Sequence, residues 1–331
     1  MSGMKNLIIL LLLTLGLSLA QAAPLKVASL HPLLSEMASE VGGDRIKVVN
    51  LFPENGELHA FEPSSAELSA AAGARLLLAC GKGVEPYLGD LSQSLSRKTR
   101  LLELGKGLPD VNVPGSEQTD PHWWNNPENM KRASRTLLTA LSEVDPGGVE
   151  YYSARQRNYS ESMDKLTRMG KLLLSRIPRE KRVLVTSHAA MCHFCEAFGF
   201  TPIAVHGVAR ESEGDTASLA ALLTQLRQKQ VACLFSEVNE PSKALEVIAR
   251  ELGIACRPLV MDGIYPRMRT YDRIFMYNVG IILSGLRGKS GSKPQGQGAA
   301  PQTSSATAPQ ASPATAPQTS PATAPQTSPH S

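Results

Sequence analysis

The chain has 331 residues and a formal net charge of +4, from 34 basic and 30 acidic side chains. A chain of this length suits two domains, each able to bury its own core. The basic residues are scattered, and only Trp123-Trp124 offers a dense aromatic surface, so nothing in the sequence supports nucleic-acid binding.

Residues 1–22 have the pattern of a secretory signal peptide. Lys5 precedes an uncharged apolar run from Leu7 to Ala20, and Ala20-Gln21-Ala22 fits a small-x-small cleavage site. The run is too short to span a bilayer comfortably. Because no cysteine precedes Cys80, we expect no lipid-anchored N-terminal cysteine. The sequence thus predicts a periplasmic protein that is neither a lipoprotein nor membrane-spanning once the signal is removed.

Strands alternate with helices in the first half of the chain. Strands are expected at Lys26–Leu30, Lys47–Leu51, Leu76–Ala79 and Arg100–Leu104, and helices at Pro32–Val41, Ser65–Ala72, Tyr87–Leu95 and Pro127–Val144. Such alternation is typical of a parallel sheet with helices on both faces. It predicts a first α/β lobe over residues 24–144.

A long linking helix is predicted within residues 145–178. Asp145-Pro146 supplies an N-cap residue and a proline at the first helical position, and Pro178 cannot continue the helix. Between them one apolar stripe recurs at helical spacing, formed by Tyr152, Tyr159, Met163, Leu166, Gly170, Leu173 and Ile177. A helix from Gly147 to Ile177 would greatly exceed the average of about 11–12 residues. It is long enough to brace two lobes; the alternative is a surface helix of one large domain.

The same alternation returns after this helix. Strands are expected at Val183–Thr186, Pro202–Val205, Ala232–Ser236 and Ala255–Met261, and helices at Ala189–Phe198, Thr216–Gln228, Ser242–Leu252 and Tyr271–Leu286. These elements predict a second lobe over residues 179–287. The expected fold class is α/β, with two parallel-sheet lobes joined by a single long helix.

The composition changes abruptly after Arg287. Residues 288–331 carry only two charges, and Ser305–Ser328 repeats an eight-residue unit, Pro-Ala-Thr-Ala-Pro-Gln-Thr-Ser in its cleanest copies. Such a segment has almost nothing to bury, so we expect a disordered tail. It is inert, or serves as a spacer or in an adhesin-like role.

Four metal-competent side chains follow the ends of predicted strands, namely His59, His122, His188 and Asp262. Ligands of parallel sheets bind beyond the carboxyl ends of the strands. Two of the four come from each half, so a cleft between the lobes could gather them all. Three imidazoles and one carboxylate form a complete four-coordinate shell for an ion such as Zn²⁺. No local motif such as HExxH links them, so the prediction depends on their shared topological position.

The segments around these residues resemble the zinc- and manganese-binding receptors of bacterial ABC importers. The similar segments are Pro53–Pro63 with its ending His59-Ala-Phe-Glu-Pro63, Asp120-Pro-His-Trp-Trp, Val185-Thr-Ser-His-Ala-Ala, Leu259-Val-Met-Asp262, Gly42-Gly-Asp-Arg and Phe235-Ser-Glu-Val. The resemblance covers residues 25–287. It implies two α/β lobes joined by a long helix, a metal ion bound between them, and an inner-membrane ABC permease as partner. We expect the receptor to be a monomer.

The chain departs from this family pattern in three places. Gly56-Glu-Leu stands before His59, Gly105–Thr119 lacks the histidine-rich loop of many zinc receptors, and Met191-Cys-His-Phe-Cys195 replaces an aromatic-rich helix start. The resemblance associates a histidine at the third ligand position with zinc. Nitrogen-rich shells also suit zinc, although the carboxylate leaves manganese or iron(II) open.

Several further residues are candidates for supporting roles. Glu62 and Glu237 are candidates to orient the ligand histidines through hydrogen bonds. Asp120 and Trp123 are candidates for the same role, against the alternatives of shielding the cleft or ordinary packing. His31 is expected to be a structural neighbour. Cys192 and Cys195 are interpreted as small core residues with His193 pointing elsewhere, against the alternatives of a thiolate ligand or a redox pair. A bridge between Cys233 and Cys256 is conceivable if their strands are neighbours.

These observations predict a metal receptor and not an enzyme. Four protein ligands leave no open position for water, whereas catalytic zinc sites usually keep one. The alternative is a secreted zinc-dependent hydrolase, with three histidine ligands and Asp262 as general base. The coordination number separates the two.

Overall fold

The computed structural model describes residues 23–54, 56–206, 216–239, 241–263, 265 and 267–287. The chain divides into two compact units, residues 1–288 and 289–331. The predicted signal peptide and the repeat tail lie outside the described residues, so both stay predictions. None of the described helices combines the length and the apolar character that crossing a membrane requires.

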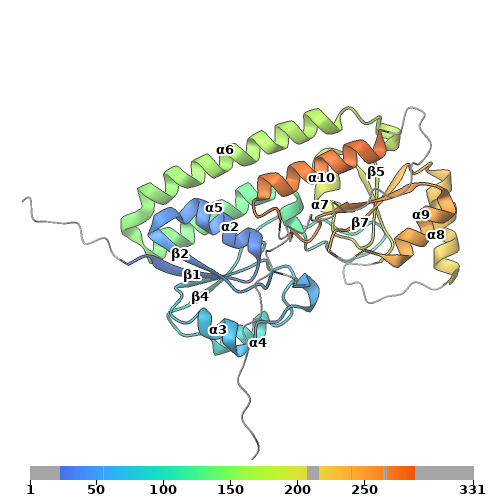
Figure 1. Ribbon diagram of the computed structural model, residues 1–331. Coiled ribbons are helices and arrows are strands. Elements are labelled where there is room, and N and C mark those ends of the chain that lie inside the picture. The colour runs from blue at the N-terminus through green and yellow to red at the C-terminus, as the bar shows by residue number, and fades with distance from the viewer. Residues whose placement is uncertain are drawn as a thin grey trace, which may run out of the picture. The chain divides into compact units, whose positions relative to one another are not determined.

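The first sheet has four parallel strands in the order β2-β1-β3-β4. They span Leu25–Ser29 (β1), Ile46–Asn50 (β2), Leu76–Ala79 (β3) and Arg100–Glu103 (β4). Helices α2 (Pro32–Gly42) and α5 (Pro127–Val144) cover one face, and α3 (Ser65–Ala70) and α4 (Leu88–Ser94) cover the other (Figure 1). Every residue of β3 is buried, as expected for a strand covered on both faces.

The second sheet repeats this topology in the order β6-β5-β7-β8. Its strands span Val183–Thr186 (β5), Thr201–Ala204 (β6), Cys233–Glu237 (β7) and Ala255–Leu259 (β8). Helices α7 (Cys192–Phe198) and α10 (Tyr271–Leu286) pack on one face, and α8 (Thr216–Gln228) and α9 (Lys243–Leu252) on the other. The predicted α/β fold with two parallel sheets is confirmed.

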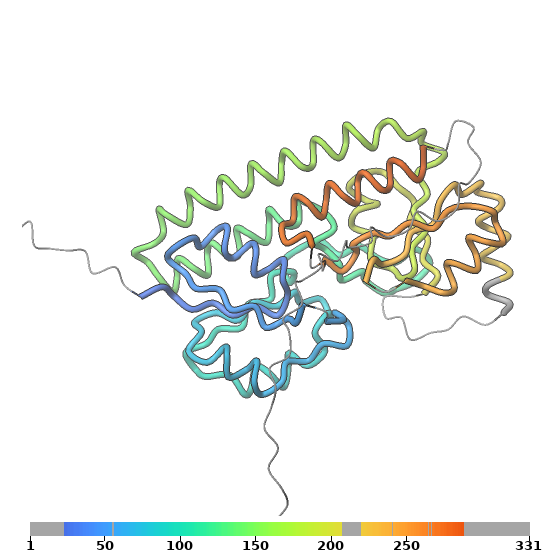
Figure 2. The backbone as a smooth tube through the Cα atoms, in the orientation of Figure 1, coloured from blue at the N-terminus to red at the C-terminus, as the bar shows by residue number. Residues whose placement is uncertain are grey.

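The long linking helix is α6, Val149–Leu174, with 26 residues. It packs against α2 and α5 of the first lobe and against α7 and α10 of the second, and its trace passes both lobes (Figure 2). Gly170 permits this contact, because a Cβ there would lie 2.8 Å from Phe198 and 2.9 Å from Phe275. The predicted stripe is buried, except that Leu174 replaces the half-buried Leu173.

The helix is shorter at both ends than the predicted Gly147–Ile177. Pro146–Gly148 forms a separate 3-10 turn, and Gly148 is the N-cap of α6. Asp145 does not cap the helix, because its carboxylate accepts hydrogen bonds from Arg45 and from the Tyr152 hydroxyl. Asp145 is the N-cap residue of the 3-10 turn, with Pro146 in its first position, but its side chain makes no capping bond. The prediction that Asp145 caps the long helix is wrong, because a distant arginine holds the carboxylate.

The two lobes share one hydrophobic core on the face of each sheet that looks toward α6. A single cluster contains Leu76 and Leu78 of the first sheet, Leu184 and Phe235 of the second, and the buried stripe of α6. The outer face of each sheet has a smaller cluster of its own. The domain limits at residues 144 and 179 stay a prediction.

Candidate metal centre

The four candidate ligands all follow the carboxyl ends of strands. His59 lies in the 3-10 turn Leu58–Ala60 after β2, and His122 immediately precedes the 3-10 turn Trp123–Asn125 after β4. His188 comes two residues after β5, and Asp262 comes three residues after β8. Because parallel strands end at one edge of their sheet, these positions bring side chains from both lobes to one place.

Strand β8 ends at Leu259, two residues before the predicted end at Met261. The Asn278 side chain on α10 takes the place of a neighbouring strand here. Its Oδ1 accepts from the Val260 N–H at 2.9 Å, and its Nδ2 donates to the Val260 carbonyl at 2.8 Å. Hydrogen bonds from a distant side chain do not alter the local pattern of apolar residues. The sequence pattern therefore predicted a strand that is two residues too long at this end.

The candidate ligand atoms of His59, His122, His188 and Asp262 all lie within 4.8 Å of one another. The Nε2 atoms of His59 and His122 are 3.1 Å apart, and His188 Nε2 is 3.1 Å from Asp262 Oδ1. His122 Nε2 is 3.6 Å from the same carboxylate oxygen. A tetrahedral ion with bonds of about 2.0–2.1 Å separates its ligand atoms by about 3.4 Å. The four side chains are therefore spaced like a coordination shell.

Asp120 determines which nitrogen of His122 faces this cluster. Asp120 Oδ1 lies 2.7 Å from His122 Nδ1 and also accepts the His122 backbone N–H at 2.8 Å. An ionised carboxylate only accepts, so the Nδ1 atom of His122 carries the proton and Nε2 presents its lone pair. Asp120 therefore orients the His122 ring; that this ring binds a metal, as the predicted role of Asp120 requires, stays a prediction.

Charge within the cluster opposes the effect of burial. Burial disfavours the ionised form of Asp262, but the electrostatic interaction and hydrogen bond with His188 and the electrostatic interactions with His122 and His59 hold the pKa of Asp262 below its usual range. Burial likewise opposes ionisation of Asp120, and the bonds from His122 keep its pKa low. Both carboxylates are thus anionic at neutral pH, and Asp262 offers a negative ligand to a cation.

His31 holds the backbone of Asp262 and is not among the converging groups. Its Nδ1 accepts the Leu33 N–H at 3.1 Å, so its Nε2 donates to the Asp262 carbonyl at 3.0 Å. Burial lowers the pKa of His31 to about 4, which keeps the ring neutral. Since both ring nitrogens already have partners, His31 is a structural neighbour, in agreement with the prediction.

Trp124 and Asn125 join the lobes beside the site, and sequence reasoning missed both. The Trp124 ring lies 5.2 Å from the His122 ring between centroids, and its indole N–H donates to the Met261 carbonyl at 3.0 Å. Asn125 Nδ2 donates to the carbonyls of Ala190 and Met261, each at 2.8 Å. The Trp123-Trp124 pair was the sequence feature that could have identified Trp124, but Trp123 was chosen as the supporting residue.

The other predicted orienting residues lie outside the cluster. Glu62 is exposed, and no hydrogen bond to a candidate ligand is found for it among the described residues. The Trp123 indole donates to the Cys80 carbonyl at 3.1 Å, within the core of the first lobe. Glu237 accepts the Met261 N–H at 2.8 Å and so supports the segment that carries Asp262.

The cysteines are free, buried or half-buried thiols. Cys233 pairs in register with Ala255 and Cys256 with Leu234, so the two cysteines lie on opposite faces of the sheet. A bridge between them would require the strands to shift, and the conceivable pairing is wrong. Cys192 and Cys195 are buried on α7, and burial raises the pKa of both thiols. Neither belongs to the converging set, which agrees with the interpretation of small core residues.

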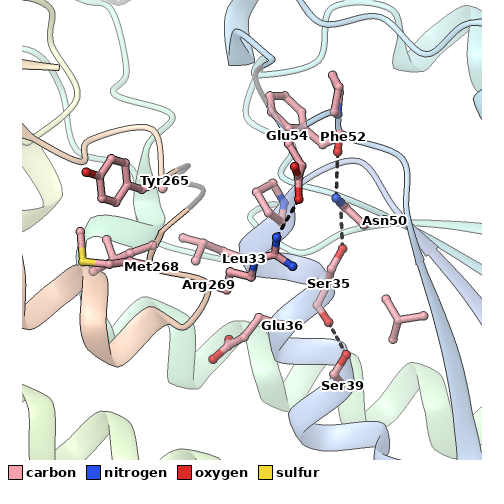
Figure 3. A pocket seen from close by; sticks show the side chains of 15 residues that line it. Leu33, Ser35, Glu36, Ser39, Asn50, Phe52, Glu54, Tyr265, Met268 and Arg269 are labelled. Atoms are coloured by element: carbon pink, nitrogen blue, oxygen red, sulfur yellow. Dashed lines mark hydrogen bonds and ion pairs between the residues drawn. The ribbon is translucent and has the colours of Figure 1, made fainter. Parts of the chain in front are cut away.

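A separate cavity of about 480 Å³ lies beside the four candidate ligands. It is lined by α2, by the end of β2 with the loop that follows, and by Gly263, Tyr265, Met268, Arg269 and Ile274. Figure 3 shows Arg269 reaching Glu54 across it, a contact of 2.7 Å between exposed side chains. None of the four candidate ligands is among its described lining residues. The cavity and the four candidate ligands are therefore distinct features of the lobe interface.

Comparison with known proteins gives consistent results. The family model described as zinc-uptake complex component A, periplasmic, matches residues 27–284. The manganese ABC transporter substrate-binding lipoprotein PsaA of Streptococcus pneumoniae is 24% identical over 275 residues, 79% of this chain and 89% of PsaA.

Solved structures share the fold. The Mn-bound S38A mutant of a periplasmic metal-binding protein from Candidatus Liberibacter asiaticus has a TM-score of 0.74 at 21% identity, over 79% of this chain and 99% of its own. The periplasmic zinc-binding protein TroA from Treponema pallidum has a TM-score of 0.71 at 20% identity, over 80% and 99%. At these identities the likeness establishes the fold.

One expectation is overturned by the relatives. The sequence predicted a periplasmic protein that is not a lipoprotein, whereas PsaA and several other matched proteins are named as lipoproteins. That prediction depended on the absence of a cysteine before Cys80; of that segment, residues 1–22, the expected signal peptide, lie outside the described residues. For lipid anchoring, the names of the relatives are better evidence than the absence of an N-terminal cysteine.

The family model spans most of the chain, and relatives such as PsaA and SloC are named as substrate-binding lipoproteins of metal ABC transporters. The hydrolase alternative finds no support among them. The chain belongs to the zinc-uptake component A family of metal-binding receptors of ABC importers, and it is not an enzyme.

Proposed function

We propose that this protein captures one zinc ion at His59, His122, His188 and Asp262 and delivers it, as a monomer, to the permease of an ABC importer. The observation that supports this most directly is the convergence of the four ligand atoms within 4.8 Å. The reaction is reversible coordination, with no bond made or broken in an organic substrate. Neutral imidazoles and an anionic carboxylate are the protonation states that metal binding requires.

The donor set supports zinc over manganese. Three imidazole nitrogens and one carboxylate are a typical zinc shell, whereas manganese prefers oxygen ligands in octahedral geometry. The 3.1, 3.1 and 3.6 Å separations lie around the value of about 3.4 Å for a tetrahedral zinc ion. Manganese or iron(II) would need additional oxygen ligands. The relatives include receptors named for both zinc and manganese, so the cargo has to be measured.

Native mass spectrometry with elemental analysis of the purified protein tests the proposal, since it reports the metal and its stoichiometry together. We expect one zinc per chain. Alanine variants of the four ligands should each lower zinc affinity by more than the 10–100-fold, roughly, that loss of an orienting partner costs. His206→Ala is the matched control, because His206 is half-buried and outside the converging set. Zinc binding that survives in all four variants would contradict the proposed site.

Metal release should involve only small movements of the lobes. The lobes share one hydrophobic cluster with α6, and Trp124, Asn125 and Tyr271 form buried hydrogen bonds between them. Opening the cleft by a large angle would break these bonds and expose the shared core. Small-angle scattering of metal-free and zinc-loaded protein should give nearly superimposable curves. A large difference in radius of gyration would contradict this expectation.

A further inference from the structure

We propose that His193, on α7 of the second lobe, is a positioning residue for the metal centre. It holds Asp120 across the lobe interface, and Asp120 in turn sets the ring of His122. This inference rests on the proposed function, because its effect on affinity presupposes that His122 binds the metal. Its structural part can be tested without metal.

His193 is buried between the lobes and makes two hydrogen bonds. Its Nε2 lies 3.0 Å from the backbone carbonyl of Asp120, and its Nδ1 lies 3.2 Å from Asn129 Nδ2 on α5. Only 1% of the residue is exposed, so water does not compete for these bonds. Both of its partners lie in the first lobe, and His193 is therefore a contact between the lobes.

The donor and acceptor in each His193 hydrogen bond follow from the Trp123 carbonyl, which can only accept. Asn129 Nδ2 also lies 3.1 Å from the Trp123 carbonyl, which identifies that atom as the amide nitrogen. The same amide group donates to His193 Nδ1, so Nε2 of His193 carries the proton. Nε2 then donates to the Asp120 carbonyl. Burial lowers the pKa of His193, which favours this neutral ring.

Asp120 is held by α7 through its side chain as well. The Cys192 backbone N–H, at the first residue of α7, donates to Asp120 Oδ2 at 2.8 Å. The other carboxylate oxygen, Oδ1, accepts from His122 Nδ1 and from its backbone N–H. Two adjacent residues of the second lobe therefore fix the carbonyl and the carboxylate of Asp120, while that carboxylate fixes a candidate ligand of the first lobe.

As a consequence, residues of the second lobe orient His122, a candidate ligand of the first lobe. With Oδ2 and the carbonyl held by α7, Asp120 cannot rotate freely, so Oδ1 keeps the His122 ring in the tautomer that offers Nε2 to the cluster. Loss of the His193 bond would leave the Asp120 carbonyl buried without its donor and loosen this arrangement. Such supporting partners typically alter metal affinity by about 10–100-fold.

The experiment compares His193→Leu, His193→Gln and Asp120→Asn in the full chain. Zinc affinity should fall by roughly 10–100-fold in His193→Leu and by less in His193→Gln, whose amide keeps a donor for the Asp120 carbonyl. If His193 acts through Asp120, the double variant Asp120→Asn/His193→Leu should lose little more affinity than Asp120→Asn alone. Additive losses would show that His193 acts by another route and would overturn the proposal.

A second readout concerns the His122 ring in metal-free protein. Nitrogen NMR of the imidazole should show a protonated Nδ1 in the wild type and in His193→Gln, and averaging of the two tautomers in His193→Leu. Gln156→Leu is the control, because it breaks a buried bond to Ser134 between α5 and α6 without contacting the metal cluster. It should leave both the zinc affinity and the His122 signal unchanged.

The outcomes separate this inference from the proposed function. If the wild type binds no zinc but His193→Leu still disturbs the His122 ring, the function fails and the positioning role stands. If His193→Leu binds zinc as tightly as wild type with an unchanged His122 signal, the positioning role is overturned. Should His193→Leu not fold, the double-variant comparison is made with His193→Gln instead. Its smaller loss of zinc affinity should not add to that of Asp120→Asn, and an additive loss would overturn the positioning role.

Discussion

The first strands of the two sheets end alike and then diverge. In β1 the Ser29 hydroxyl donates to the His31 carbonyl at 2.9 Å, and in β5 the Thr186 hydroxyl donates to the His188 carbonyl at 2.7 Å. Each histidine thus follows its strand by two residues and is held by the same short turn. Of these two histidines, only His188 is among the four candidate ligands that converge.

The difference lies in where the next helix begins. Pro32 directly follows His31 and starts α2, so the His31 ring caps that helix by accepting the Leu33 N–H. After His188 the chain runs for three residues before α7 starts at Cys192, and the His188 ring takes no part in capping it. Because α7 begins later after His188 than α2 does after His31, the His188 ring is not used as a cap and its Nε2 faces Asp262. Equivalent position in a repeated topology is therefore not enough to make a ligand.

The largest expected effect separates these two histidines by metal affinity. His188→Ala removes a proposed ligand and should lower zinc affinity by more than about 100-fold. His31→Ala removes no ligand; it removes the hydrogen bond to the Asp262 carbonyl and the cap of α2, and it should lower zinc affinity by about 10–100-fold. Competition titration against a zinc chelator measures both. A greater loss in His31→Ala than in His188→Ala would reverse the assignment of roles.

The pH dependence of stability should also single out His31. Its pKa is about 4 in the fold, below the ordinary value of 6.5, so the unfolded chain binds the extra proton first. The neutral His31 ring contributes to the free energy of unfolding above pH 6.5. This contribution is lost as the pH falls toward 4, and it amounts to a few kcal/mol at most, roughly. Urea unfolding of metal-free protein between pH 7 and 4 should show this loss, and His31→Ala should show a smaller slope. Equal slopes would contradict the role of His31.

A smaller effect is expected from the cap itself at neutral pH. His31→Ala removes the acceptor for the Leu33 N–H at the start of α2 and should lower the free energy of unfolding of metal-free protein by about 0.5–2 kcal/mol. His188→Ala has no cap to lose. Equilibrium unfolding in urea, with metal removed from both proteins, compares them. If the two variants unfold at the same urea concentration, capping is not what distinguishes these histidines.

The smallest effect is expected where the lobes meet in solvent. Arg269 and Glu54 form an ion pair between residues whose side chains are 76% and 73% exposed. Exposed pairs contribute about 0–1 kcal/mol, so Arg269→Ala should scarcely change the melting temperature or zinc affinity. Asn125→Leu, which removes two buried bonds between the lobes, is the contrasting variant and should lower both. If Arg269→Ala and Asn125→Leu lowered the melting temperature and zinc affinity equally, burial would not explain the relative importance of these contacts.

Much of the fold follows from local sequence signals. Apolar periodicity with proline, glycine and capping residues predicts Pro127–Val144, Thr216–Gln228 and Tyr271–Leu286 with the observed bounds. Two of the errors occur where a distant side chain replaces a local partner. Asn278 ends β8 early, and Arg45 draws Asp145 away from its predicted cap. Neither interaction has a periodic signature.

The sequence by itself determined two similar α/β halves, a long helix between them, and a set of metal-competent side chains placed after strand ends. Tertiary structure alone decided which of those side chains converge and how they are held. His193 meets Asp120 across 73 positions of sequence, and Trp124 meets Met261 across 137. Periodicity reports only neighbours within a helix or strand, whereas the state of an imidazole depends on whichever atoms the folded chain brings within hydrogen-bond distance.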